Sequence, residues 1–500
     1  MTVIRLSDGI VKDEVLVVGL AVKSSQGVKS GTALQIESGD LALDTKALLA
    51  SLADMGATGK AEEVIKIPGS ATRLLVFTGL GKQSATYEHE VLRRAAGAAA
   101  RSLAGNSTAT FSLPAKDESS VRAVAEGAAL GNYLFDQFRG STKKAQKAPL
   151  KTVTIHTSLA GKAKVQAQIA EVIATYTYLV RDLINTPPSH LTPESFCTAI
   201  TAAVKKAGGA AAGLKVSVMT DSQLRSKGYG GIIGVGQGSA NPPRLLSITY
   251  TPKGLKAKKK YAFVGKGITF DTGGLALKPA LGMEAMKSDM SGAAAVCAAA
   301  IAIAQLRLPV AIEAWAPLAE NMVSDTATRP SDVITIYGGK TVEVLNPDAE
   351  GRLVLADALV KAQESKDLDG IIDVATLTGA QVVALGTRTS AVMTNNSEFS
   401  AKFVEITKRT GEAFWPMPLP IELRASLDSP VADLANIGER MGGMLVAGLF
   451  LKDFVSDELP WLHLDIAGPS YNEGAPHGYT PVGGTGVALR SLVQLALDEQ

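Results

Sequence analysis

The sequence predicts an α/β protein with two domains: a smaller, mixed α/β domain at the N-terminus and a larger α/β domain at the C-terminus, whose central, mostly parallel sheet carries the site. Length is the first observation, since 500 residues suit two or three domains. The second is that the first part of the chain alternates short β-rich runs with alanine-rich helical ones. The third observation concerns the rest of the chain, where continuous apolar runs alternate with helical ones. This pattern is typical of a parallel sheet covered by helices on both faces.

The N-terminal domain is predicted to cover residues 1–163. A helix is expected over 118–135. The polar and basic residues 140–151, which include a proline, are expected to form a linker or an exposed loop. Runs rich in β-branched and other apolar residues predict strands at 15–22, 73–81, 108–114 and 152–157.

A connecting helix is predicted over 164–185, because an amphipathic pattern runs up to Pro187 and Pro188, and consecutive prolines forbid its continuation. The larger domain, 186–500, opens with a helix whose N-cap is Thr192. Its strands are expected at 215–220, 245–250, 261–267, 310–317, 371–377, 390–395 and 461–468. Its other helices are expected at 291–306, 351–364, 397–410, 444–455 and 485–498.

The charge balance points to no strong attraction towards nucleic acid or anionic membranes. Apolar residues make up 46% of the chain, charged residues 20%, and the net charge is only +2. The basic run at 256–260 is a candidate patch, but we interpret it as a solvated loop and the edge of a strand, where lysines block unwanted pairing. A second basic stretch, at 143–151, is also short.

Two cysteines, Cys197 and Cys297, cannot form a disulfide framework, and both lie in apolar helical patterns. A reducing, cytoplasmic setting is therefore expected. The N-terminal residues lack a basic stretch followed by an apolar run, so no secretory signal is expected. The most apolar segment, 292–304, is shorter than the roughly 20 residues of a membrane helix, and we predict that it is a buried helix.

Acidic residues gather where predicted strands end and helices begin. Asp271 follows a strand in a glycine-rich loop, Asp289 precedes the helix at 291, and Asp348 and Glu350 precede the helix at 351. The chain has no HExxH, CxxC or GxSxG motif, and its five histidines show no ligand spacing. A metal here would therefore need oxygen ligands.

Each of these charges also has a structural interpretation. Asp289 could cap its helix, and Asp348 and Glu350 could be ordinary first-turn acids that complement the helix dipole. Lys266 and Lys278 could be surface and loop charges. Taken singly, most of the five favour the structural interpretation.

Three separated motifs favour the functional interpretation of these charges over the structural one. They are NPDAEGRL at 346–353, VGKGITFDTGG at 264–274 and MKSDMSGAAAV at 286–296. Together they resemble the cytosolic leucyl aminopeptidases, two-metal enzymes whose signature is N-T-D-A-E-G-R-L. Most of the second half of the chain is similar to that family, whereas the first 150 or so residues fit only in general α/β character. Pro347 replaces the usual threonine, and we expect it to alter loop rigidity without abolishing activity.

The resemblance implies two divalent metal ions per subunit, manganese or zinc, although oxygen ligands and one amine do not choose between metals. Asp271 and Glu350 would bridge the ions, and Asp348 would complete one site. Lys266 and Asp289 would complete the other. An ammonium has no lone pair, so Lys266 would have to bind as a neutral amine with a pKa far below about 10.4.

The family also implies roles for residues that are not ligands. Lys278 would stabilise the charge that develops on the scissile carbonyl oxygen, and Arg352 would hold a bicarbonate that acts as general base. Met286, Thr376 and Leu377 would line the pocket for the first side chain of the substrate. Plain packing is the alternative for these three, and for Met286 the two interpretations are nearly even.

The implied function is a metal-dependent aminopeptidase that uses a metal-bridging hydroxide to remove a leucine-like N-terminal residue from short peptides. The peptide's free α-amine would coordinate one metal, and the protein would be a cytoplasmic homohexamer. Two alternatives remain. A carboxylate-held metal pair can also hydrolyse phosphoesters, although no arginine cluster is evident. A hexamer on this scaffold could also be a DNA-binding regulatory protein, and such a protein should carry a stripe of basic residues on its surface.

Overall fold

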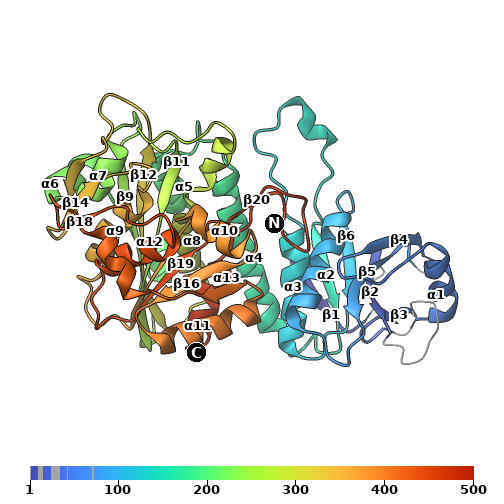
Figure 1. Ribbon diagram of the computed structural model, residues 1–500. Helices are drawn as coiled ribbons and strands as arrows, with labels where there is room; N and C mark the ends of the chain where they lie inside the picture. The colour runs from blue at the N-terminus through green and yellow to red at the C-terminus, as the bar shows by residue number, and fades with distance from the viewer. Residues whose placement is uncertain (1, 10–14, 24–33, 42, 70–71) are drawn as a thin grey trace. The chain divides into compact units, whose positions relative to one another are not determined.

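The computed structural model describes residues 2–9, 15–23, 34–41, 43–69 and 72–500 (Figure 1). The chain divides into two compact units. Unit 1 comprises Met1–Tyr178 together with the later segment Glu473–Val482, and unit 2 comprises Leu179–Asn472 and Gly483–Gln500. The boundaries predicted at 163 and 185 stay a prediction.

Unit 1 is built on a seven-stranded sheet whose central strand is β2 (Val15–Val22). The neighbours of β2 in the sheet, β5 and β6, run parallel to it, while β3 pairs with it antiparallel. The strand order is β1 (Val3–Ser7), β7 (Thr152–His156), β6 (Thr108–Ser112), β2, β5 (Leu74–Lys82) and β4 (Val64–Pro68), with β3 (Leu34–Glu37) off this path.

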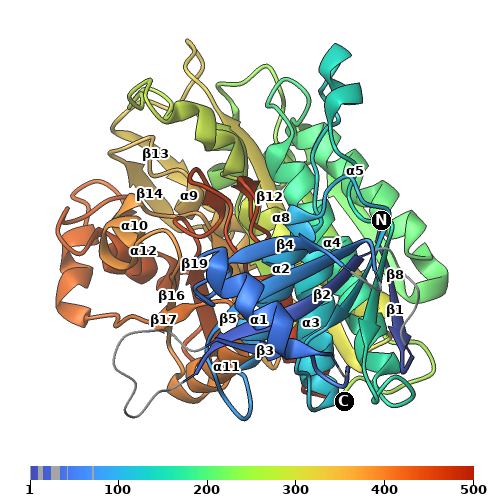
Figure 2. The same ribbon diagram turned by 90° about the vertical axis from the view of Figure 1, so that its right-hand side faces the viewer.

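Both faces of this sheet are covered, which explains the unbroken apolar run of β2. Val15 and Val17 contribute to a core with α2 (His89–Ser102) and α3 (Glu118–Gly131), whereas Leu16 and Val18 face α1 (Thr45–Asp54). Several strands of this sheet and the helices α1, α2 and α3 are labelled in Figure 2. The linker predicted over 140–151 contains the short, exposed helix η1 (Ser141–Ala145). The helix α4 (Lys164–Asn185) follows.

Unit 2 contains a nine-stranded sheet whose four central strands, β19, β15, β10 and β12, are mutually parallel. Antiparallel pairs extend it at both edges. The prediction of a mostly parallel sheet is thereby confirmed. The strand order is β17 (Phe414–Pro416), β16 (Ser390–Thr394), β19 (Trp461–Asp465), β15 (Gly370–Ala375), β10 (Lys259–Gly265), β12 (Val310–Asn321), β9 (Arg244–Tyr250) and β8 (Leu214–Met219), with β11 (Gly267–Asp271) paired to β12.

Helices cover both faces of the sheet in unit 2. On one face, α7 (Gly230–Gly236), α9 (Gly351–Ala362) and α12 (Gly443–Lys452) share a core with β10, β15 and β19. α8 (Ser291–Gln305) packs on the other, with α5 (Pro193–Lys206) and α13 (Leu489–Leu497) against it. The remaining elements of this unit are α6 (Asp221–Lys227), α10 (Gly379–Leu385), α11 (Ser397–Thr410), η2 (Gly209–Ala212), η3 (Met283–Ser288), η4 (Ile421–Leu427), β13 (Asp332–Thr335), β14 (Thr341–Val344), β18 (Leu434–Ala435), β20 (Tyr471–Asn472) and β21 (Gly483–Gly484).

The apolar segment 292–304 lies in α8, and this helix is buried, as predicted. Together with η3 it forms a 23-residue segment, Met283–Gln305, that is long and apolar enough to cross a membrane by length and composition alone. However, 94% of its most apolar window is buried inside the protein, as in the core helix of a globular domain. Cys297 lies on α8 and Cys197 on α5, and both thiols are buried and free.

Several details differ from the sequence predictions. The helix predicted over 118–135 ends at Gly131, and the one predicted over 444–455 ends at Lys452. The lysine run at 256–260 does not lie on a sheet edge but leads into β10, a central strand, where Lys259 pairs with Asp369 and Lys260 with Glu313. The last helix begins at Leu489, four residues later than expected, because Ala488 adopts a positive φ of 74° that a continuous helix does not allow.

Candidate active site

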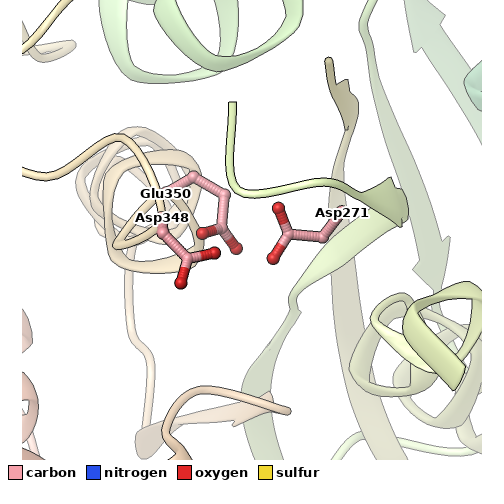
Figure 3. A group of neighbouring side chains, drawn as sticks. All are labelled: Asp271, Asp348 and Glu350. Atoms are coloured by element: carbon pink, nitrogen blue, oxygen red, sulfur yellow. The ribbon is translucent and has the colours of Figure 1, made fainter. Parts of the chain in front are cut away.

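Separate segments of unit 2 bring the acidic residues together near the carboxyl ends of central strands. Asp271 ends β11, and Asp348 and Glu350 lie in the loop before α9. Figure 3 shows the carboxylate of Asp271 facing those of Asp348 and Glu350. These three residues each offer an oxygen within 4.8 Å of the others, which is the spacing of a shared metal site.

Lys266 joins this cluster to Asp289, the residue before the N-cap of α8. Its Nζ lies 2.9 Å from Asp289 Oδ2 and 2.8 Å from Glu350 Oε1, and it donates a hydrogen bond to the carbonyl of Thr376 at 2.9 Å. Burial opposes the charged form, but the carboxylates of Asp289, Glu350 and Asp271 outweigh it and raise the pKa of Lys266. Lys266 is therefore an ammonium unless cations compete for the same carboxylates.

Lys278 occupies the more open side of the cluster. Its Nζ lies 2.9 Å from Asp271 Oδ2 and 2.5 Å from Asp348 Oδ1, and its side chain is half-buried. Burial would lower the pKa of Lys278, but the neighbouring carboxylates, Asp271 first among them, raise it. A charged, partly accessible donor thus stands beside the acids.

The acidic side chains beside α8 and α9 do not cap these helices by hydrogen bonds. The N-cap of α8 is Met290 and that of α9 is Glu350, and neither side chain accepts a capping hydrogen bond. Burial raises the pKa of Glu350 to about 8, with Asp271 adding to the effect, and burial also raises the pKa of Asp289. Acids crowded together in a buried place with no capping role are a frequent sign of a functional site.

The donor set fits divalent cations. Within the described part of the chain, Asp289 Oδ2, Asp348 Oδ1 and Glu350 Oε1 are buried without a hydrogen bond of good geometry, although each lies within 2.9 Å of a lysine nitrogen. Buried carboxylate oxygens normally have directed partners. Here the close partners of these oxygens are lysine ammonium groups, which divalent cations could replace, and oxygen donors suit Mn²⁺, Zn²⁺ or Mg²⁺.

Arg352 lies in the first turn of α9, and its side chain is buried. Its Nη1 donates to the carbonyl of Asn436 at 2.7 Å, and its guanidinium stands 5.8 Å from the centre of the Phe450 ring. Its Nε has no hydrogen-bond partner among the described residues. Burial lowers the pKa of Arg352 to about 10, so it remains a cation at neutral pH.

The three residues predicted to line a substrate pocket lie on two segments. Met286 is half-buried on η3, and Thr376 and Leu377 follow β15. Thr376 donates its hydroxyl hydrogen to Asp289 Oδ1 at 2.6 Å, and the Leu377 N–H donates to Asp465 Oδ1 at 3.1 Å. Thr376 thus holds a proposed ligand in place, and the pocket role of all three stays a prediction.

Two asparagines, Asn321 and Asn436, belong to the site but were not predicted from the sequence. Asn321, at the end of β12, donates from Nδ2 to Asp271 Oδ1 at 2.9 Å and to the Pro347 carbonyl at 3.1 Å. Asn436 holds the loop before α9. The position of Asn321 at a strand end was the available signal, whereas Asn436 lies in a segment without a recognisable motif.

Comparison with known proteins decides the family. The sequence model of the cytosol aminopeptidase family, catalytic domain, matches residues 178–493, and that of its N-terminal domain matches 15–144. The chain belongs to the cytosol aminopeptidase family. The family predicted from the motifs is therefore confirmed, and the N-terminal match covers a region for which the motifs gave no specific signal.

Individual relatives agree with the family. A probable cytosol aminopeptidase of Streptomyces avermitilis is 51% identical over 99% of this chain and 98% of its own length. One of Rhodococcus jostii is 48% identical over 97% and 94%. Among solved structures, the bottromycin maturation enzyme BotP in complex with Mn is 36% identical, has a TM-score of 0.84, and is covered completely by 97% of this chain.

Family membership makes the protein a metal-dependent aminopeptidase that acts on peptides. The cluster of Asp271, Asp348 and Glu350 is the matching candidate for its metal site. Neither a phosphoesterase nor a DNA-binding function is favoured by these findings.

Proposed function

We propose that the protein removes the N-terminal residue, with a preference for leucine-like side chains, from short peptides by means of two divalent cations. Lys266, Asp271, Asp289, Asp348 and Glu350 would hold the cations, with Mn²⁺ or Zn²⁺ as the metals. One observation carries the proposal: these side chains converge, all buried except the partly exposed Asp348, and three of their carboxylate oxygens have lysine ammonium groups as close partners.

The cation pair, when bound, supplies Lewis acidity that lowers the pKa of a shared water and polarises the scissile carbonyl. Lys266 must contribute the lone pair of a neutral amine, so binding releases its proton. Glu350 and Asp289 both pair with Lys266, and Asp271 and Asp348 both pair with Lys278. Because Asp271 and Glu350 also offer oxygens close to each other, these two acids would be the ones shared by both cations. The four carboxylates balance four positive charges.

Lys278 and Arg352 act on the reacting groups. Because Lys278 pairs with Asp271 and Asp348 at the accessible side of the cluster, its ammonium can turn to the carbonyl oxygen and stabilise the negative charge that develops there. Arg352 keeps its Nε without a partner among the described residues, which supports a role in holding a bicarbonate. That anion would accept a proton from water and pass it to the leaving amine.

Substrate preference and assembly form the finer part of the proposal. Met286, Thr376 and Leu377 would line the pocket for the N-terminal side chain, and the peptide's α-amine would bind one cation. We also infer a homohexamer, which restricts substrates to short peptides. A cytoplasmic location fits the relatives, which are named cytosol aminopeptidases.

Two chromogenic substrates test this function. Full-length protein with Mn²⁺ should release nitroaniline from leucine p-nitroanilide and little nitrophenol from p-nitrophenyl phosphate, and a chelator should abolish the first reaction. Glutamate and lysine p-nitroanilides, compared with the leucine compound, test the side-chain preference. Faster hydrolysis of the phosphate ester, or equal rates on all three nitroanilides, would contradict the corresponding part of the proposal.

A further inference from the structure

Asn436 is the completely buried residue that follows the two-residue strand β18. We propose that Asn436 is a positioning residue that fixes two parts of the site at once: the loop that carries Asp348 and Glu350, and the guanidinium of Arg352. The inference rests on the proposed function, in which those residues hold the cations and the anion.

The side chain of Asn436 is fully used by the ligand loop. Its Oδ1 accepts the N–H of Leu345 at 2.8 Å and that of Asn346 at 3.1 Å. Its Nδ2 donates to the carbonyl of Asn346 at 2.7 Å and to that of Ala349 at 3.3 Å. An asparagine amide has two donor hydrogens and one oxygen with two lone pairs, so all four positions have partners.

The backbone of Asn436 connects the same loop to its surroundings. The N–H donates to the Glu343 carbonyl at 2.9 Å, next to the pairing of β18 with β14. The carbonyl accepts from Arg352 Nη1 at 2.7 Å. One residue therefore joins the three-stranded sheet of β13, β14 and β18, the loop and the first turn of α9.

The loop needs this support because its residues, 345–350, form neither helix nor strand. Asp348 and Glu350 stand at alternate positions on it, so a small rotation of the loop would move both. Ligand sites require side chains held within about 0.5 Å of their working positions. Loss of groups that orient metal ligands typically weakens metal affinity by about 10–100-fold.

Two substitutions separate the contributions. Asn436→Asp keeps the shape and the acceptor but replaces both donor hydrogens by an oxygen that faces two carbonyls, which disfavours the present loop position. Asn436→Ala removes all four loop contacts and leaves the backbone carbonyl that holds Arg352. Both variants should loosen the loop, and Asn436→Asp should do so more strongly.

Asn395→Ala provides a matched control. Asn395 also joins separate strands and loops of unit 2, since its Nδ2 donates to the Leu459 carbonyl at 3.0 Å and its Oδ1 accepts the Trp461 N–H at 2.9 Å. It touches none of the proposed ligands in these contacts. Its loss should lower thermal stability without a specific effect on cations.

The experiment measures Mn²⁺ affinity by calorimetry on cation-free, full-length protein, together with the thermal midpoint and with kcat and KM for leucine p-nitroanilide. We expect both Asn436 variants to bind Mn²⁺ about 10–100-fold more weakly. Their kcat should fall more than their KM rises, and Asn395→Ala should match the wild type in Mn²⁺ affinity. Asn436→Ser, which keeps a small hydrogen-bonding group, replaces any variant that does not fold.

The outcomes distinguish this inference from the proposed function. Folded Asn436 variants with wild-type Mn²⁺ affinity would overturn the inference alone. Equal weakening in Asn395→Ala would also overturn it, because the effect would then be general destabilisation. A wild-type protein that binds no Mn²⁺ would overturn the proposed function and this inference with it.

Discussion

Gly351 shows how closely the proposed ligands are packed. A Cβ at this position would lie 2.5 Å from Lys266 Cε and 2.7 Å from its Nζ. The side chain of Lys266 cannot move aside without losing contacts, because its ammonium binds Asp289, Glu350 and the Thr376 carbonyl. The glycine in the NPDAEGRL motif is thus a condition for the lysine to reach the carboxylates.

Replacing this glycine should therefore affect cation binding more than the stability of the fold. Gly351→Ala should weaken Mn²⁺ binding by at least about tenfold, the lower bound for misplaced ligands. Alanine is the better helix former, which offsets part of the cost of displacing Lys266, so the thermal midpoint should change much less than the Mn²⁺ affinity. Calorimetric titration and thermal unfolding measure the two effects.

Gly379→Ala is the control for that substitution, since Gly379 is also the first residue of a helix and an added Cβ would meet nothing within 4 Å. It should leave Mn²⁺ affinity unchanged. Wild-type affinity in Gly351→Ala would mean that Lys266 is not held where we place it.

Lys266 gives a second residue-scale prediction. An amine can lose its proton and bind a cation, whereas a guanidinium stays protonated in proteins. Lys266→Arg should therefore retain at most one Mn²⁺ per chain, as counted by elemental analysis after desalting. It should also lose nearly all peptide hydrolysis. Two retained cations in this variant would exclude Lys266 as a ligand.

Sequence reasoning at this scale found residues with a recognisable pattern and missed those without one. Acids at strand ends and helix starts are visible in a sequence, and the structure does bring Asp271, Asp348 and Glu350 together. Asn436 is 90 residues distant from the loop that it holds. Such a contact exists only through the fold, so no local pattern announces it.

At the scale of elements, the neighbouring strands β15 and β19 carry a buried polar group. Asp373 accepts a hydrogen bond from Trp461 Nε1 at 2.7 Å, and its other oxygen lies 2.5 Å from His463 Nδ1. Burial disfavours a charged imidazole, but Asp373 outweighs it and raises the pKa of His463 above its usual value. Within a parallel sheet this pair is a source of pH-dependent stability.

The sign of the pH dependence of stability follows from the direction of that pKa shift. An unfolded histidine has a pKa of about 6.5, and the folded pKa is higher. The stabilisation is fully present below about pH 6.5 and is lost as the pH rises through the folded pKa. The free energy of unfolding, measured by denaturant titration between about pH 6 and 9, should fall with pH in the wild type.

His463→Gln removes the proton uptake but can still donate to Asp373. Its unfolding free energy should vary less with pH over the same interval. An identical pH slope in wild type and variant would show that His463 is not responsible.

Element boundaries were predictable where a local signal marks them. Thr192 is the N-cap of α5, as predicted, and the structure adds a capping box with Ser195; α11 spans the predicted residues 397–410 behind its cap, Asn396. By contrast, the start of α13 depends on the positive φ of Ala488, and the two-residue strand β18 forms only because β14 lies beside it. Tertiary context sets such features, and sequence periodicity does not contain it.

At the scale of the whole molecule, the segment Glu473–Val482 belongs to unit 1 although the chain on either side belongs to unit 2. Tyr479 donates its hydroxyl hydrogen to Glu90 at 2.9 Å, and the Gly478 N–H donates to Glu62. The helix α2 approaches so closely that a Cβ on Gly97 would lie 2.5 Å from Tyr479 Cβ and 2.7 Å from its Cα. This ten-residue insertion could not be assigned from sequence, because its own composition carries no such information.

Gly97→Ala should therefore disturb the packing of α2 against Tyr479 and destabilise this segment. Overpacking against backbone typically lowers the free energy of unfolding by about 1–3 kcal/mol. Denaturant unfolding measures the loss, and hydrogen exchange of residues 473–482 should become faster. Gly161→Ala is the control, since its Cβ would meet nothing within 4 Å. Equal effects of both substitutions would contradict this packing.

The central claim is that one cluster of side chains holds two cations that peptide hydrolysis requires. The most direct measurement counts the Mn²⁺ or Zn²⁺ retained per chain by the wild type and by Asp348→Asn, and follows leucine p-nitroanilide hydrolysis on the same samples. We predict two cations per wild-type chain, and joint loss of cation and turnover in the variant without a change in thermal midpoint. Full activity in protein stripped by a chelator, or two cations retained by Asp348→Asn, would contradict the account.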